Sequence, residues 1–128
     1  SNHEIQQDRI GSAQVLASRF NSLIVLKGAG TICAFPDDNW YINPSGNPGL
    51  SSSGMGDILC GMIAALVGQR LSAEKATLLA VYLHGLAADM LVKNGTGPIG
   101  LTASEITSTA RSLLNQWVYA SSKWLDER

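Results

Sequence analysis

The spacing of hydrophobic and polar residues predicts one helix and three short strands in the first part of the chain. Hydrophobic side chains recur at helical intervals over residues 10–20, with polar side chains elsewhere around the helix. The unbroken apolar run 23–26 predicts a strand that is covered on both faces and has parallel neighbours. Residues 31–35 and 40–42 predict two more strands, and the Pro-Asp-Asp-Asn turn at 36–39 favours a hairpin between them.

Three further helices are predicted in the rest of the chain. Small and apolar residues fill positions 58–67, and Gly68 is a suitable end for this helix. The next helix begins after Ser72, a good N-cap residue, and is apolar around most of its circumference, which indicates that it is buried. Thr102 and Glu105 have the spacing of a capping box at the start of the last helix.

This order of elements indicates an α/β fold in which helices outnumber strands. A sheet of so few strands has edges that proteins rarely leave uncovered. Only 15% of the residues are charged, against about 25% in an ordinary globular protein. We therefore expect one domain over residues 1–128 that is a fragment of a larger α/β domain, and self-association into a homo-oligomer. Residues 1–4 are interpreted as a tag or linker.

Composition narrows the class of protein further. A hydrophobic fraction of 45% is enough for a packed core, and a net charge of −1 provides no long-range attraction to nucleic acid. The apolar run 58–67 is shorter than the ~20 residues of a membrane-spanning helix, and no secretory signal is recognised. Cys33 and Cys60 lack the spacing of a metal site or disulfide, which predicts buried free thiols. We expect a cytoplasmic protein with neither nucleic-acid nor membrane partners.

Residues 43–56, rich in Gly, Ser, Asn and Pro, are predicted as a loop, and the candidate chemistry lies in its part 47–57, which ends where the second predicted helix begins. Glycines allow a ligand to approach the backbone closely, and the first turn of a helix offers unpaired N–H groups and positive potential. Together these features favour a phosphate site. Asp57 follows the loop; a carboxylate there stays ionised and can accept the proton of a hydroxyl that attacks phosphorus. The alternative is that Asp57 is an ordinary N-cap behind a linker.

A second candidate segment is Lys-Gly-Ala-Gly-Thr at residues 27–31, directly after the strand predicted over 23–26. In open α/β sheets, ligands bind outside the carboxyl ends of parallel strands. Lys27 can pair with a phosphate there, and Thr31 can donate its hydroxyl. The alternative is an ordinary glycine turn with a solvated lysine. His84, in the long apolar helix, is interpreted as a hydrogen-bonded core histidine.

Four motifs taken together resemble one known family. They are Ile-Gln-Gln-Asp-Arg at 5–9, Val-Leu-Lys-Gly-Ala-Gly-Thr at 25–31, Asn-Pro-Gly to Gly-Met-Gly-Asp over 47–57, and Val-Tyr-Leu-His-Gly-Leu-Ala at 81–87. In this combination and order they are similar to the ADP- or ATP-dependent NAD(P)H-hydrate dehydratases. Members of that family have the three-layer α/β/α fold of ribokinase-like carbohydrate kinases, so the resemblance implies a C-terminal portion of this fold.

The resemblance implies a nucleotide-dependent repair activity. Such enzymes phosphorylate the hydroxyl of hydrated NADH or NADPH with ADP or ATP and Mg²⁺, and then eliminate phosphate. Asp57 matches the carboxylate that contacts the hydrate and acts as the base. The implied nucleotide contacts, none of them metal ligands, are Lys27, Gly28, Ala29, Gly30, Thr31, Asn47, Gly49, Ser53, Gly54, Met55 and Gly56. The bacterial character of the motifs favours ADP.

The chain also departs from the family pattern. Family domains are longer, and residues 51–54 are Ser-Ser-Ser-Gly where the family often has Ala-Thr-Gly or Ala-Thr-Ala before the last glycine. We therefore expect weak or no turnover from this chain alone. A ribokinase-like kinase of a vitamin precursor or sugar, and a non-catalytic nucleotide-binding module, are the alternative functions.

Overall fold

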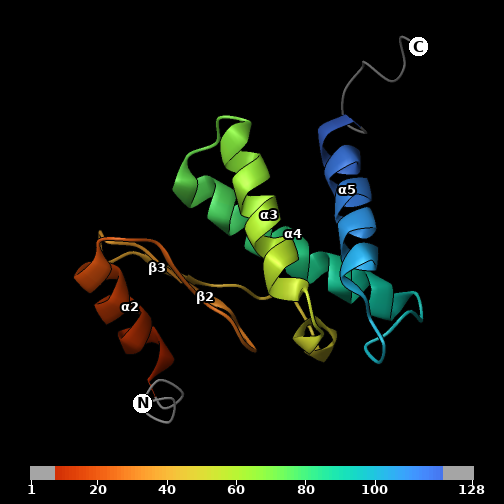
Figure 1. Ribbon diagram of the computed structural model, residues 1–128, viewed down its shortest axis with the longest axis horizontal. Coiled ribbons are helices and arrows are strands. Elements are labelled where there is room, and N and C mark those ends of the chain that lie inside the picture. Colours follow the sequence, from red (N-terminus) through yellow and green to blue (C-terminus); the bar gives the residue numbers. More distant parts are fainter. Residues whose placement is uncertain (1–7, 120–128) are drawn as a thin grey trace.

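The computed structural model describes residues 8–119, so the tag or linker expected at 1–4 lies outside the described residues. Each predicted helix and strand is present, with ends that differ by a few residues (Figure 1). In chain order the elements are α2 (Arg9–Phe20), β1 (Ile24–Leu26), β2 (Ile32–Ala34), β3 (Trp40–Ile42), the 3-10 helix η1 (Pro48–Ser51), α3 (Met55–Gly68), α4 (Ala73–Lys93) and α5 (Ala103–Tyr119).

The three described strands form one antiparallel sheet in the order β1-β2-β3. Ile24 pairs with Ala34 across the first ladder, and Ile32 pairs with Ile42 across the second. The prediction of parallel neighbours for β1 is therefore wrong within residues 8–119. The short connection between β1 and β2 explains the result, because a parallel crossover needs a dozen or more residues.

The sheet forms the middle of three layers. On β2, Ile32 and Ala34 pack against α2, whereas Cys33 between them packs against α3 and α4 on the opposite face. This alternation follows from the two-residue period of a strand. Figure 1 shows the same arrangement, with α2 on one side of the strands and α3 and α4 on the other. The α/β fold class is confirmed, and the layering agrees with the expected portion of an α/β/α fold.

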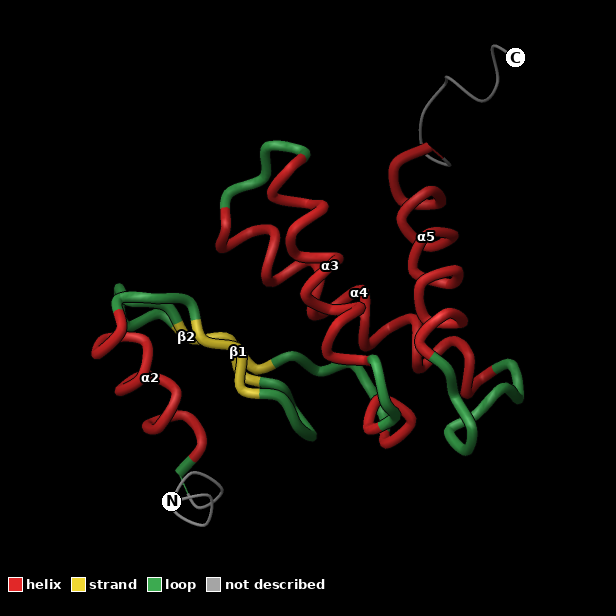
Figure 2. The backbone as a smooth tube through the Cα atoms, in the orientation of Figure 1, coloured by secondary structure: helices red, strands yellow, loops and turns green. Residues whose placement is uncertain are grey.

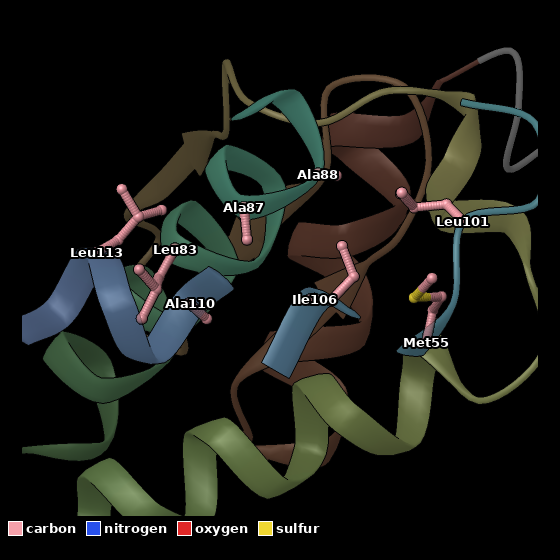
Figure 3. Close-up of a cluster of buried hydrophobic side chains, with 8 residues drawn as sticks. All are labelled: Met55, Leu83, Ala87, Ala88, Leu101, Ile106, Ala110 and Leu113. Carbon is pink, nitrogen blue, oxygen red and sulfur yellow. The ribbon is translucent and has the colours of Figure 1, made fainter. Parts of the chain in front are cut away.

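The second half of the chain packs around α4, which contacts both α3 and α5. Buried side chains from these helices and from the segment before α5 form a continuous core (Figure 3). α4 is the one helix within residues 8–119 that is long and apolar enough to cross a membrane, but half of its apolar window is buried inside the protein. Its composition therefore agrees with the prediction of a buried helix.

The predicted caps of the last two helices are confirmed. The Ser72 hydroxyl accepts a hydrogen bond of 3.2 Å from the Lys75 N–H at the start of α4. At the start of α5, the Thr102 N–H donates to the Glu105 carboxylate at 3.0 Å, and the Glu105 N–H donates to Thr102 Oγ1 at 3.4 Å. These reciprocal bonds satisfy backbone donors that a helix leaves unpaired at its first turn.

Three local predictions are wrong. α3 begins at Met55, three residues before the predicted start, and η1 interrupts the predicted loop. Asn47 explains η1, because its side chain accepts a hydrogen bond from Gly49 N–H and caps this short helix, with Pro48 as its first residue. Cys60 is exposed rather than buried. α3 is apolar on more sides than the protein buries, so composition alone did not indicate which side faces solvent.

Candidate functional site

A pocket of about 640 Å³ opens between the sheet and α4. One wall is the turn that joins β1 to β2, residues 27–31, and the opposite wall includes residues 43–48. Val81, His84 and Gly85 of α4 contribute further lining. The volume lies within the range of about 300–1,000 Å³ that is typical of small-molecule sites.

Arg9 of α2 fixes the first wall from behind. Its guanidinium donates hydrogen bonds to the carbonyl oxygens of Ala29 at 2.7 Å, of Gly30 at 3.2 Å and of Leu26 at 3.2 Å. Gly28 and Gly30 have φ values of 154° and 64°, which residues with a side chain rarely adopt. Because the carbonyl groups face Arg9, the turn keeps one conformation while its other side lines the pocket.

Thr31 closes this turn. Its hydroxyl donates to the Gly28 carbonyl oxygen at 3.1 Å and accepts from the Gly28 N–H at 3.3 Å. Thr31 therefore stabilises the turn, a structural role that the sequence did not predict beside its contact with a ligand.

The start of α3 and the side chain of Lys27 come together beside the pocket. Gly54 precedes the helix with φ of 83° and supplies no side-chain cap. The first helical hydrogen bond runs from Ile58 N–H to the Gly54 carbonyl at 3.1 Å, so the three N–H groups before it are left unpaired by the helix. A Cβ added at Gly56 would lie 3.3 Å from Lys27 Nζ. An ammonium group and a helix N-terminus thus face the same place, an arrangement that favours an anion.

Asp57 is exposed, and it is the third residue of α3 rather than its N-cap, which is Gly54. The alternative interpretation of Asp57 as an N-cap is therefore wrong. None of the hydrogen bonds described for residues 8–119 involves its carboxylate. Both oxygens are therefore able to accept a proton, or a hydrogen bond from a hydroxyl group. Asp57 lies in the first turn of the helix and is not part of the pocket lining.

The structure brings about half of the predicted nucleotide contacts into the pocket. These are Lys27, Gly28, Ala29, Gly30, Thr31 and Asn47. Gly49 is buried, and its N–H donates to Asn47 Oδ1 at 3.0 Å. Ser53, Gly54, Met55 and Gly56 lie outside the pocket lining, at the start of α3. The Met55 side chain is 1% exposed in the core, so only its backbone is available to a ligand. The roles of all these residues stay predictions.

His84 is a lining residue that the sequence did not assign to the site. Its side chain is 3% exposed, as predicted for a core histidine, but within residues 8–119 its Nε2 has no hydrogen-bond partner. Burial lowers the pKa of His84, the positive charge of Lys27 lowers it further, and a hydrogen bond with the Met55 backbone acts in the opposite direction. The imidazole is therefore held neutral. The prediction of a buried, hydrogen-bonded histidine is confirmed by the Met55 bond, and Nε2 is the ring nitrogen left without a partner.

Apart from Asn47, the sequence also did not predict the residues of the opposite wall as part of the site. Asn43, Ser45, Gly46 and Gly85 line the pocket. One signal was available in the sequence, because a glycine inside a helix costs about 1 kcal/mol relative to alanine. At Gly85 the reason is packing: an added Cβ would lie 2.8 Å from the Ser45 backbone carbonyl carbon. A glycine in the middle of an apolar helix thus indicated a close approach by another segment.

The layered fold and its positively charged pocket define an α/β protein with a site suited to phosphate groups. The family model described as NAD(P)H-hydrate dehydratase, of the carbohydrate kinase type, matches residues 1–111. The chain belongs to this family, as its four motifs predicted.

Relatives and solved structures agree with this assignment. The chain is 40% identical over 113 residues to the bifunctional NAD(P)H-hydrate repair enzyme of Coxiella burnetii, which covers 88% of this chain and 23% of that protein. It is 38% identical over 113 residues to the ADP-dependent (S)-NAD(P)H-hydrate dehydratase of Neisseria meningitidis, covering 88% of this chain and 38% of that one.

Among solved structures, the fold is similar to the ADP/ATP-dependent NAD(P)H-hydrate dehydratase from Bacillus subtilis co-crystallized with ATP/Mg²⁺. The TM-score is 0.85 at 34% identity, over 90% of this chain and 41% of that one. The chain thus spans less than half the length of each of these proteins.

Proposed function

We propose that the pocket binds the phosphate groups of ADP or ATP, and that the chain takes part in nucleotide-dependent dehydration of hydrated NADH or NADPH. The single observation that carries this proposal is the position of Lys27 Nζ beside Gly56 at the start of α3. Two independent sources of positive potential meet there, next to a pocket of suitable size. ADP is the donor we expect, because the relative from Neisseria meningitidis is ADP-dependent.

The described residues position the reacting groups and supply one base. Lys27 and the N–H groups at the start of α3 hold the terminal phosphoryl group and stabilise its negative charge. Asp57 accepts the proton of the hydrate hydroxyl while that oxygen bonds to phosphorus and the bond from phosphorus to the nucleotide breaks. In a second step the C–O bond breaks, phosphate leaves and the neighbouring carbon loses a proton. The dihydronicotinamide is restored without a change of oxidation state.

Mg²⁺ fits this site only as a companion of the nucleotide. Within residues 8–119, no three His, Cys, Asp or Glu side chains gather to hold a metal ion. Mg²⁺ usually keeps several waters and binds substrate phosphates together with one or two carboxylates. We therefore expect it to enter with the nucleotide phosphates.

Two measurements on the 128-residue chain test the proposal. Calorimetric titration with ADP and ATP in the presence of Mg²⁺ should give saturable binding that Lys27→Met weakens. Incubation with hydrated NADH and ADP should restore dihydronicotinamide absorbance, weakly at most in this chain. Product that keeps its phosphate would instead identify a kinase, whereas binding without any reaction would agree with the weak or absent turnover expected of this chain. Failure to bind either nucleotide would contradict the proposal.

A further inference from the structure

We propose that Asp89 is a positioning residue whose carboxylate holds residues 43–47, here called the strap, against α4 so that they form one wall of the pocket. Asp89 itself is not among the lining residues. Figure 2 shows the loop that carries the strap leaving the sheet and running towards η1 beside α4. The claim that the strap prepares the pocket for a nucleotide rests on the proposed function. The claim that Asp89 holds the strap does not depend on that function.

Both oxygens of Asp89 are used by the strap. The Gly46 N–H donates to Oδ2 at 2.9 Å, and Asn47 Nδ2 donates to Oδ1 at 2.9 Å. The side chain is half-buried, so these bonds compete less with water than surface bonds do. Hydrogen bonds to an ionised acceptor are roughly twice as strong as neutral ones. Asp89 thereby anchors a backbone group and a side chain at the same time.

The remaining bonds of the strap to α4 are neutral and go to backbone oxygens. Asn43 Nδ2 donates to the Val81 carbonyl at 3.3 Å, and Ser45 Oγ donates to the Tyr82 carbonyl at 3.0 Å. Each of these carbonyl groups lies inside a helix, so the strap offers it only a second hydrogen bond. Asp89 is the one charged partner that residues 8–119 provide for the strap.

Asn47 carries the effect of Asp89 further along the chain. While its Nδ2 is bound to Asp89, its Oδ1 accepts from the Gly49 N–H at 3.0 Å and caps η1. Residues 50–52, which end η1 and follow it, also line the pocket. One carboxylate therefore fixes the orientation of an amide that sets the start of η1. The amide of Asn47 is thus engaged within the protein, although the sequence predicted it as a nucleotide contact.

A strap held in advance improves binding by lowering the entropy that a ligand must otherwise remove. The segment is rich in Pro, Ser, Gly and Asn and has few apolar side chains to anchor it. Such a segment opens at low free energy unless polar bonds hold it. Ordering it at the moment of binding would reduce affinity without the loss of any ligand contact.

A hydrogen-bond exchange between two positions tests the inference. Asp89→Asn places an NH₂ group against the donors of Gly46 or Asn47, and Asn47→Asp places two carboxylates against each other. The double variant Asp89→Asn with Asn47→Asp restores a complementary set at unchanged net charge, because the exchanged carboxylate can still accept from the Gly49 N–H. Two readouts are used: hydrogen exchange at the Gly46 amide without nucleotide, and the dissociation constant of ADP.

Each single variant should speed exchange of the Gly46 amide by about tenfold or more and weaken ADP binding by a similar factor. The double variant should recover most of both losses. Glu74→Gln is the matched control, because it removes one negative charge from the exposed first turn of the same helix; it should change both quantities less than about twofold. Asn47→Ala, which leaves the bond between Asp89 and Gly46, is a milder variant should Asp89→Asn fail to fold.

Unchanged Gly46 exchange in Asp89→Asn, or a double variant as impaired as the singles, would overturn the inference. Recovery of exchange without recovery of ADP affinity would overturn the claim that the strap prepares the pocket for nucleotide. If the unmodified chain bound neither ADP nor ATP, the proposed function and that claim would both fail. Gly46 exchange would then still decide whether Asp89 holds the strap.

Discussion

The ammonium group of Lys27 lies against the backbone of Gly56, so close that a Cβ at Gly56 would be 3.3 Å from Nζ. Lys27 directly follows β1 and Gly56 is the second residue of α3, so two separate motifs of the sequence meet at this contact. Without an anion, an ammonium group beside a helix N-terminus is electrostatically unfavourable. An anion between them removes this cost, and the absence of a side chain at Gly56 leaves room for the lysine.

Gly56→Ala should weaken ADP binding by about tenfold while leaving the fold intact, because the added methyl group displaces the flexible end of Lys27. Gly61→Ala, on the same helix, is the control, because a Cβ there meets nothing within 4 Å. Alanine favours a helix over glycine by about 1 kcal/mol, so neither variant should unfold more easily. Calorimetry and thermal unfolding check both expectations. Equal ADP affinities of the two variants would contradict the assigned role of the contact.

Asp57→Asn should lower whatever turnover the chain has by about two to four orders of magnitude, because the amide cannot accept the hydroxyl proton. ADP affinity should be little changed, because the exposed carboxylate lies outside the pocket lining. Parallel assays of dihydronicotinamide recovery and of ADP binding separate the two quantities. Asp37→Asn, an equal change of charge in the exposed turn before β3, should affect neither. Full turnover by Asp57→Asn would exclude Asp57 as the base.

Arg9→Lys should destabilise the protein by about 1–3 kcal/mol, because a single ammonium group cannot replace the guanidinium that bonds three carbonyl groups. Urea unfolding measures the change, and hydrogen exchange at the amides of residues 28–30 should increase. Arg19→Lys, an exposed substitution on the same helix, should change stability by less than about 0.5 kcal/mol. A destabilisation equal to that of Arg19→Lys would show that Arg9 does not fix the turn.

His84 should make stability fall in mild acid. Burial and the charge of Lys27 lower its pKa in the folded protein, so on acidification the unfolded chain takes up this proton first. The contribution is fully present above the ordinary histidine pKa and is lost as the pH falls towards the lowered value. Urea unfolding at several pH values should therefore show a smaller loss of stability in His84→Leu than in the unmodified chain. An identical pH dependence in both proteins would contradict this assignment.

Nucleotide should also change the titration of His84. Phosphate beside Lys27 offsets the positive charge that helps to lower the pKa of His84, so ADP should raise that pKa. Titration of the imidazole by NMR with and without ADP measures the difference. A pKa that ADP leaves unchanged would indicate that phosphate does not reach Lys27.

The sequence predicted the elements well because their signals are local. The caps at Ser72 and Thr102 and the helical spacing over residues 10–20 each depend on neighbouring residues only. The direction of β1 was predicted wrongly, because an apolar run indicates burial but not the partner strand. The exposure of Cys60 depends on which side of α3 the rest of the protein covers, and that is a property of the assembled fold.

The candidate site could be predicted only in part for the same reason. Residues 27–31 were found because glycines, a lysine and a threonine together form a recognisable turn. His84 and the strap come together only through packing between distant segments, and the bonds from Asp89 to Gly46 and Asn47 join residues more than forty positions apart. Self-association and a cytoplasmic location stay predictions.

The contrast between the two cysteines makes the chain suited to single-site labelling. Burial raises the pKa of Cys33 to about 11, and the thiolate is the form that reacts, so a maleimide dye at neutral pH will bypass it. Cys60 is exposed on α3 and three residues after Asp57, which places the two on the same side of the helix. A fluorophore can thus be installed one helical turn from the proposed base without any substitution.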